Sequence, residues 1–180
     1  DQRGSGFPRI IGGTVDIGAF ETAQFTLHTT LQGRVANPTP HPRYIVDVRV
    51  RITRAIDGAL VHTASLTTNP SAEVFLFGLP SDTYRVWVKG THTLARMSGD
   101  VTVNALNENT SYVTAPLPEG DADDNNQVSL NDFVILAQTF GLVFGAPGYD
   151  ARADFNGDGL ITIADFSLLA INFGQVGDVP

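Results

Sequence analysis

Hydrophobic and polar residues alternate along much of residues 22–117. The clearest example is the stretch YIVDVRVRITR, residues 44–54, in which every second residue is apolar. A period of two is typical of a β-strand that buries one face. The core-facing residues of this strand are expected to be Tyr44, Val46, Val48, Val50 and Ile52. The opposite face is expected to carry Asp47, Arg49, Arg51 and Thr53.

About seven stretches of this kind follow one another, with no helical spacing between them. They cover Phe25–Arg34, Tyr44–Arg54, Leu60–Thr68, Glu73–Phe77, Thr83–Lys89, Asp100–Asn104 and Ser111–Leu117. Strands at this spacing are typical of two packed antiparallel sheets. The sequence therefore predicts a mainly β N-terminal part, with a β-sandwich over residues 22–117.

A different pattern begins after the segment APLPEGD, whose Pro116 and Pro118 favour a stiff, extended chain. Two later stretches have apolar residues at the i, i+3, i+4 and i+7 positions of an amphipathic helix. The first set is Phe133, Leu136, Ala137 and Phe140, and the second is Phe166, Leu169, Ala170 and Phe173. The next residues, Gly141 and Gly174, are typical helix ends. This duplication predicts a separate small α module over residues 119–180 whose two apolar stripes face each other.

Each predicted helix is preceded by an acidic twelve-residue loop, DADDNNQVSLND at 121–132 and DFNGDGLITIAD at 154–165. A hard cation such as Ca²⁺ takes six to eight oxygen ligands, and a loop of this length supplies them from positions 1, 3, 5, 7, 9 and 12. The predicted ligands of one ion are Asp121, Asp123, Asn125, Gln127, Ser129 and Asp132. Those of a second ion are Asp154, Asn156, Asp158, Leu160, Thr162 and Asp165. Gln127 and Leu160 would contribute main-chain oxygens, and Ser129 and Thr162 would act through water.

Without a cation the carboxylates of each loop would repel one another. A module of this size without cysteine has few other sources of stability, so bound metal is expected to supply much of it. Position 6 requires a left-handed turn, which Gly159 adopts freely and Asn126 adopts less readily. The first loop is therefore expected to bind calcium more weakly. Val128 and Ile161, at position 8, are expected to pair the two loops through a short β-bridge.

The prolines before the first loop exclude the entering helix of paired calcium sensors. Loop–helix repeats without that helix, here over residues 120–175, resemble the dockerin family. The resemblance implies a non-catalytic calcium module that binds a cohesin domain on a scaffold or cell-surface protein. It also implies partner contacts at positions 10 and 11 of each loop, which are Leu130 and Asn131, and Ile163 and Ala164. Cellulosomal dockerins often have a Ser–Thr pair at these positions, so the identity of the partner stays open.

Two shorter resemblances concern the rest of the chain. The segment FGLPSDTYRVWVKG resembles part of transthyretin-like and collagen-adhesin-stalk domains, and residues 6–21 resemble the end of a secreted parallel β-helix protein. Residues 1–21 form an extended apolar segment. This segment could pack on its own sandwich, or it could be donated as a strand to a neighbouring copy. Strand donation would build an extracellular filament.

Composition and scattered side chains limit the remaining possibilities. The net charge of −8 argues against a nucleic-acid groove, and no apolar run is long enough to span a membrane. The four histidines are scattered and no nucleophile motif accompanies them, so no enzymatic activity is expected.

Two features of the predicted outer strand faces stay open. Trp87 could stack on a sugar or pack on neighbouring side chains, and the residues Arg49, Arg51, Arg54, Arg85 and Lys89 could be solvated or could contact the acidic module.

The sequence as a whole predicts a non-catalytic, calcium-binding attachment module of a secreted or cell-surface protein. Its expected partner is a cohesin-like domain or a neighbouring copy of itself. The alternatives are a self-assembling filament subunit and a carbohydrate-binding β-sandwich, the latter with polysaccharide as a partner.

Overall fold

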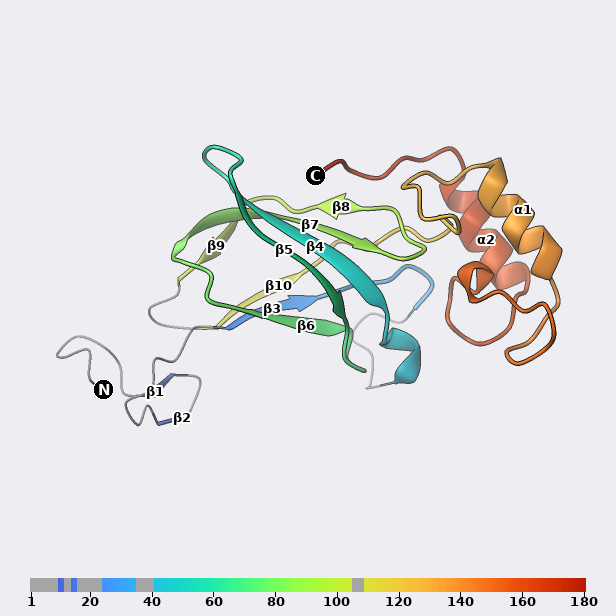
Figure 1. Cartoon of the computed structure of the whole chain (residues 1–180), viewed down its shortest axis with the longest axis horizontal. Helices are drawn as coiled ribbons and strands as arrows, with labels where there is room; N and C mark the ends of the chain where they lie inside the picture. Colours follow the sequence, from blue (N-terminus) through green and yellow to red (C-terminus); the bar gives the residue numbers. More distant parts are fainter. Residues whose placement is uncertain (1–9, 12–13, 16–23, 35–40, 105–108) are drawn as a thin grey trace.

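The computed structural model describes residues 10–11, 14–15, 24–34, 41–104 and 109–180. It has two parts, a β-sandwich and a smaller helical module, and the C-terminal end of the chain runs back from the module towards the sandwich (Figure 1). This architecture confirms the prediction of a mainly β N-terminal part followed by a small α module.

The larger sheet of the sandwich is antiparallel. It contains the strands β5 (Leu60–Thr67), β4 (Asp47–Arg54), β7 (Asp82–Gly90) and β8 (Arg96–Met97) in that order, and β9 (Val101–Val103) also pairs with β7. The smaller sheet has the order β10 (Thr110–Val113), β3 (Gln24–His28) and β6 (Glu73–Phe77). In this sheet β3 pairs antiparallel with β6 and parallel with β10.

Apolar residues from the inner faces of both sheets form one core. Val48, Val50 and Ile52 of β4 are at most 1 % exposed, as the alternating pattern predicts. They pack in one cluster with Phe25 and Leu27 of β3 and with residues of β6 and β7. Tyr44 is also buried, but it lies in the 3₁₀ turn η1 (Pro42–Tyr44), so the prediction that it belongs to the strand is wrong. Pro42 sits in the first turn of η1, a position that suits proline because its missing N–H is not needed there.

Other strand boundaries also differ from the predictions. β3 ends at His28 and β10 ends at Val113, both earlier than predicted, although the Thr29 amide still donates to the Ala72 carbonyl just before β6. The two-residue strand β8 is too short to produce an alternating pattern. Near the N-terminus, β1 (Ile10–Ile11) pairs with β2 (Thr14–Val15), and the other residues of 1–21 lie outside the described part of the chain. Strand donation by residues 1–21 therefore stays a prediction.

The helical module contains α1 (Leu130–Thr139), the 3₁₀ turn η2 (Ala151–Ala153) and α2 (Ile163–Asn172). Ser129 and Thr162 cap the two helices, and each helix has an aspartate at its third position that completes a capping box. Each helix is followed by an extended phenylalanine and then by a left-handed glycine, Gly141 or Gly174. The described helices are all too short to span a membrane.

The predicted apolar stripes are only partly buried. Leu136 and Leu169 are 1 % and 2 % exposed, whereas Phe140 and Phe173 are about half exposed. Two helices alone cannot enclose all of both stripes. The rest of the module core comes from the loops and the sandwich. The buried residues of the whole core are Leu94, Ala122, Val128, Leu136, Ala153, Phe155, Ile161 and Leu169.

The predicted β-bridge between the two loops is wrong. Val128 of the first loop instead bonds the chain after α2, where its amide donates to the Gln175 carbonyl and its carbonyl accepts from the Gly174 amide. Ile161 of the second loop makes the equivalent pair of bonds with Leu142 and Gly141, after α1. Each loop is thus closed by the segment that follows the other helix. This exchange ties the two repeats together.

Candidate metal centres

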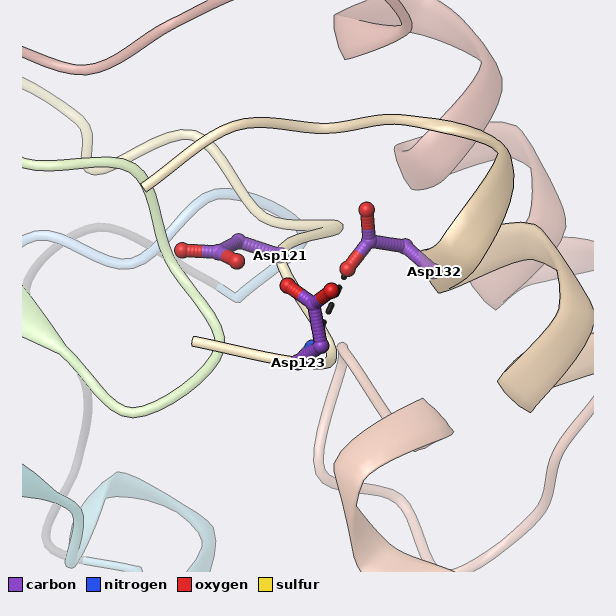
Figure 2. A group of neighbouring side chains, drawn as sticks. All are labelled: Asp121, Asp123 and Asp132. Carbon is purple, nitrogen blue, oxygen red and sulfur yellow. Dashed lines mark hydrogen bonds between the residues drawn. The ribbon is translucent and has the colours of Figure 1, made fainter. Parts of the chain in front are cut away.

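Three carboxylates converge in the first loop. Asp121, Asp123 and Asp132 place one oxygen each within 4.8 Å of one another (Figure 2). Asp121 and Asp132 are fully buried, and Asp123 is partly exposed. Asp132 comes from the first turn of α1, whereas the other two come from the start of the loop. The fold therefore brings together positions 1, 3 and 12, as the spacing predicts.

Main-chain amides fix these carboxylates in place. The Asn125 and Asn126 amides donate to Oδ1 and Oδ2 of Asp121 over 2.9 and 2.8 Å. The Asp123 and Ser129 amides donate to the two oxygens of Asp132 over 3.0 and 2.8 Å. The loop is folded around its own acids, and each carboxylate retains lone pairs for a further donor or a cation.

The second loop repeats this pattern of bonds. The Asp158 and Gly159 amides donate to Asp154 over 3.1 and 2.9 Å, and the Asn156 and Thr162 amides donate to Asp165 over 3.2 and 2.9 Å. Position 6 is left-handed in both loops, with φ of +68° at Asn126 and +83° at Gly159. The two loops are therefore equivalent in conformation as well as in sequence.

The donor set of each loop fits a hard cation. It consists only of oxygens, which Ca²⁺ prefers. Burial raises the pKa of Asp121 and of Asp165, since the charged form of each carboxylate loses solvation. A divalent cation between these acids would restore favourable electrostatics for their charged forms.

The hydroxyls at position 9 have a structural role. Ser129 and Thr162 accept hydrogen bonds from the amides of Asn131 and Ala164 and so begin the helices. Positions 10 and 11 follow directly, and all four of their residues are exposed. Leu130 and Ile163 are 64 % and 66 % exposed, which is high for large apolar side chains.

Lys89 of β7 is a buried partner of the first loop, which is one of the two alternatives that the sequence left open for this residue. Its Nζ donates to Oδ2 of Asp121 over 2.6 Å and to Oδ1 of Asp124 over 2.7 Å. Arg49, on the neighbouring strand β4, also pairs with Asp124. The alternating pattern places both cations on the outer sheet face, and here that face contacts the acidic module. Arg54 and Arg85 instead pair with exposed acids of the sandwich.

Arg34 reaches the second loop from the turn after β3. Its guanidinium donates to the Phe155 carbonyl over 3.2 Å and lies against Gly157, where an added Cβ would come within 3.1 Å of Cζ. It also pairs at 3.9 Å with the buried Glu119. Burial lowers the pKa of Arg34, and the neighbouring Glu119 opposes this shift. No pattern in the sequence indicates this contact.

Asn126 connects the first loop to both the sandwich and the C-terminal segment. Its Oδ1 accepts from the Ala95 amide over 2.8 Å, and its Nδ2 donates to the Asp178 carbonyl over 3.2 Å. The same carbonyl accepts the indole N–H of Trp87 over 2.8 Å. Asparagine therefore provides contacts here that glycine lacks. The indole N–H of Trp87 is engaged by the chain itself, which does not favour sugar binding at this residue.

Replacing Asn126 with glycine is expected to lower the free energy of unfolding by about 1–2 kcal/mol, because two side-chain hydrogen bonds are lost while glycine accepts the left-handed backbone. Chemical denaturation with calcium present measures this change. The matched control is Gly159→Asn, which introduces the same side chain at the equivalent position of the second loop. Equal effects of the two substitutions would contradict a special role for Asn126 at the junction.

Comparisons with known proteins agree with this architecture. Residues 119–173 match the family model for the dockerin type I domain. The fold is similar to chains in two crystal structures of type II cohesin–X-dockerin complexes from Acetivibrio cellulolyticus. In the complex with a C-terminal interface mutant, the TM-score is 0.61 at 17% identity, over 86% of this chain and 97% of the other. In the complex with an N-terminal interface mutant, the TM-score is 0.57 at 17% identity. The match covers 87% of this chain and 97% of the other. No curated protein sequence matches the chain.

Proposed function

We propose that this chain, whose residues 119–173 form a dockerin segment carried on a β-sandwich, is a calcium-dependent attachment module of a secreted or cell-surface protein. Dockerin segments are assembly modules without catalytic activity, and the chain is assigned no enzymatic role. The observation that carries the proposal is the pair of equivalent acidic loops, each with the same set of amide-to-carboxylate bonds.

Two calcium ions would bind, one in each loop. Asp121, Asp123, Asn125 and Asp132 would hold the first ion with the main-chain oxygen of Gln127, and Ser129 would contribute through water. Asp154, Asn156, Asp158 and Asp165 would hold the second ion with the main-chain oxygen of Leu160, and Thr162 would contribute through water. Bound calcium supplies positive charge that neutralises the clustered carboxylates. The chain's own amides keep these carboxylates oriented.

The partner would be a cohesin-like domain. The solved complexes that share this fold pair a dockerin with a cohesin. In the present chain, Leu130 and Ile163 expose apolar side chains at the start of two equivalent helices, next to Asn131 and Ala164. The apolar side chains at three of these four positions, Leu130, Ile163 and Ala164, favour a partner with an apolar patch. Because the two repeats are nearly equivalent, either helix could provide most of the contacts with the partner.

The alternatives gain less support. The filament hypothesis depends on residues 1–21, most of which lie outside the described part of the chain. Carbohydrate binding by the sandwich depends on Trp87, which is only partly exposed and donates its N–H to the Asp178 carbonyl.

The proposal is tested by measuring the affinity of the chain for a panel of cohesin domains of both types in calcium and in EGTA. Binding in calcium only is expected. The double substitution Leu130→Asp and Ile163→Asp should weaken it at least about 100-fold, since both candidate contacts would then place a charge against an apolar surface. Ile56→Asp changes a residue that is 84 % exposed in the β4–β5 turn and should have no effect. Undiminished binding in EGTA would contradict the calcium dependence, and full affinity of the double variant would contradict the assigned surface.

A further inference from the structure

The only lysine of the chain is buried against the first calcium loop. Lys89 is 2 % exposed, and its Nζ contacts Asp121, Asp124 and the Thr93 carbonyl over 2.6, 2.7 and 2.7 Å. Lys89 belongs to β7 of the sandwich, whereas Asp121 belongs to the helical module. The positive charge of the ammonium therefore reaches the position-1 carboxylate from the sandwich side.

The equivalent acid of the second loop has a neutral partner. Oδ2 of Asp154 accepts from the Tyr149 hydroxyl over 2.7 Å, where Oδ2 of Asp121 accepts from Lys89. A tyrosine hydroxyl is neutral at neutral pH, so this donor brings no charge to Asp154. The Arg34 guanidinium near this loop bonds the Phe155 carbonyl and pairs with Glu119, so its charge lies near Asp154 without a direct bond to that carboxylate. The two loops thus differ in the charge of the group that contacts position 1.

This difference has an electrostatic consequence when no divalent ion is bound. Asp121 then still has a buried counter-charge, and breaking such a pair is costly because it leaves an uncompensated charge. Asp154 is bonded by neutral donors, and the nearest described cation, Arg34, bonds other groups, so repulsion between its carboxylate and the other acids of its loop is less compensated. The first loop is also joined to the sandwich through Asn126 and Ala95.

We infer that Lys89 acts as a resident cation of the first loop, which holds Asp121 in position and keeps this loop folded on the sandwich when calcium is absent. Among the residues that the structure describes, no cationic side chain bonds the position-1 carboxylate of the second loop, and this loop would order only with calcium. This inference rests on the proposed calcium binding. It makes the removal of calcium a stepwise change, in which the second loop opens while the first loop stays docked.

Amide hydrogen exchange followed by NMR on the full chain tests the inference at two equivalent amides, those of Asn126 and Gly159, which both donate to the position-1 carboxylate. In EGTA, the Asn126 amide should exchange at least tenfold more slowly than the Gly159 amide after correction for intrinsic rates. In calcium, both should be protected. Equal protection factors in EGTA would overturn the inference. Calcium that protects neither amide would instead overturn the proposed function.

Lys89→Met separates the ammonium from the other junction contacts, because it keeps a similar chain length without the charge. In EGTA it should reduce the protection of Asn126 at least tenfold, whereas Arg85→Met, an exposed position of the same strand, should leave it unchanged. The Val88 and Val50 amides of the sandwich core report whether the variant stays folded. If they lose protection, Asp121→Asn replaces Lys89→Met as the test and should have the same effect on Asn126. Unchanged protection of Asn126 in the folded variant would overturn the inference.

Discussion

Replacing Asp165 with alanine is expected to abolish calcium binding by the second loop and to lower the free energy of unfolding by about 2–4 kcal/mol. The Asp165 carboxylate is fully buried and accepts the amides of Asn156 and Thr162. Its removal leaves two donors without a partner, each worth about 1–3 kcal/mol where it stays buried. It also removes the capping box that begins α2.

Isothermal titration calorimetry and chemical denaturation, both with calcium, measure the two effects of Asp165→Ala. Titration should show one bound ion instead of two. The control is Asp100→Ala, because Asp100 is an exposed acid that pairs with Arg85 at the sandwich surface. This control should change stability by no more than about 0.5 kcal/mol. A variant that still binds two ions would contradict the assignment of Asp165 as a ligand.

Phe155→Ala is expected to destabilise the chain by about 3–5 kcal/mol, which is the usual cost of emptying a buried phenylalanine site. Phe155 is fully buried at position 2 of the second loop and contacts the His92 ring of the sandwich, with the ring centroids 6.1 Å apart. The equivalent residue of the first loop is the much smaller Ala122, which is also buried. The second loop therefore depends on one large side chain for its packing.

Urea denaturation with calcium present measures the effect of Phe155→Ala. Phe144→Ala is the matched control, because Phe144 belongs to the same connecting region but is 79 % exposed. Its removal should change stability by no more than about 1 kcal/mol, the small cost of the ring contact with Tyr149. Similar losses in the two variants would show that burial of Phe155 does not provide the stability of this module.

The sequence predicted the features that depend on local pattern. Alternation located β4 to β7 closely. The duplicated acidic spacing located a first loop whose carboxylates converge and a second loop with the same amide-to-carboxylate bonds. Tyr44 was misplaced because the alternation continues through Ile45 into a 3₁₀ turn that starts at a proline. The pairing of Val128 and Ile161 was misassigned because spacing along the chain does not tell which repeat closes which loop.

The remaining errors concern contacts between the two parts of the chain. Alternation correctly places Lys89 on an outer sheet face, but it could not decide whether this face is solvated or contacts the acidic module, as it does. Asn126 was interpreted as a poor substitute for glycine, since the partner of its side chain, the Ala95 amide, lies far away in sequence. The weaker calcium affinity expected for the first loop stays a prediction. Residues whose partners come from another module have roles that a one-dimensional pattern does not contain.

Residues 175–178 return to the sandwich, and this determines how a mechanical force on the helical module would be transmitted to the sandwich. The helical module is joined to the sandwich where the chain enters it, at Glu119 and Asp121, and again where it leaves, through Asp178 to Trp87 and Met97. A force applied to the exposed helices is therefore shared among several contacts in parallel. It is not carried by the connecting segment 116–118 alone. Anchorage at two points also prevents swivelling, so a bound partner would keep a fixed angle to the sandwich while under tension.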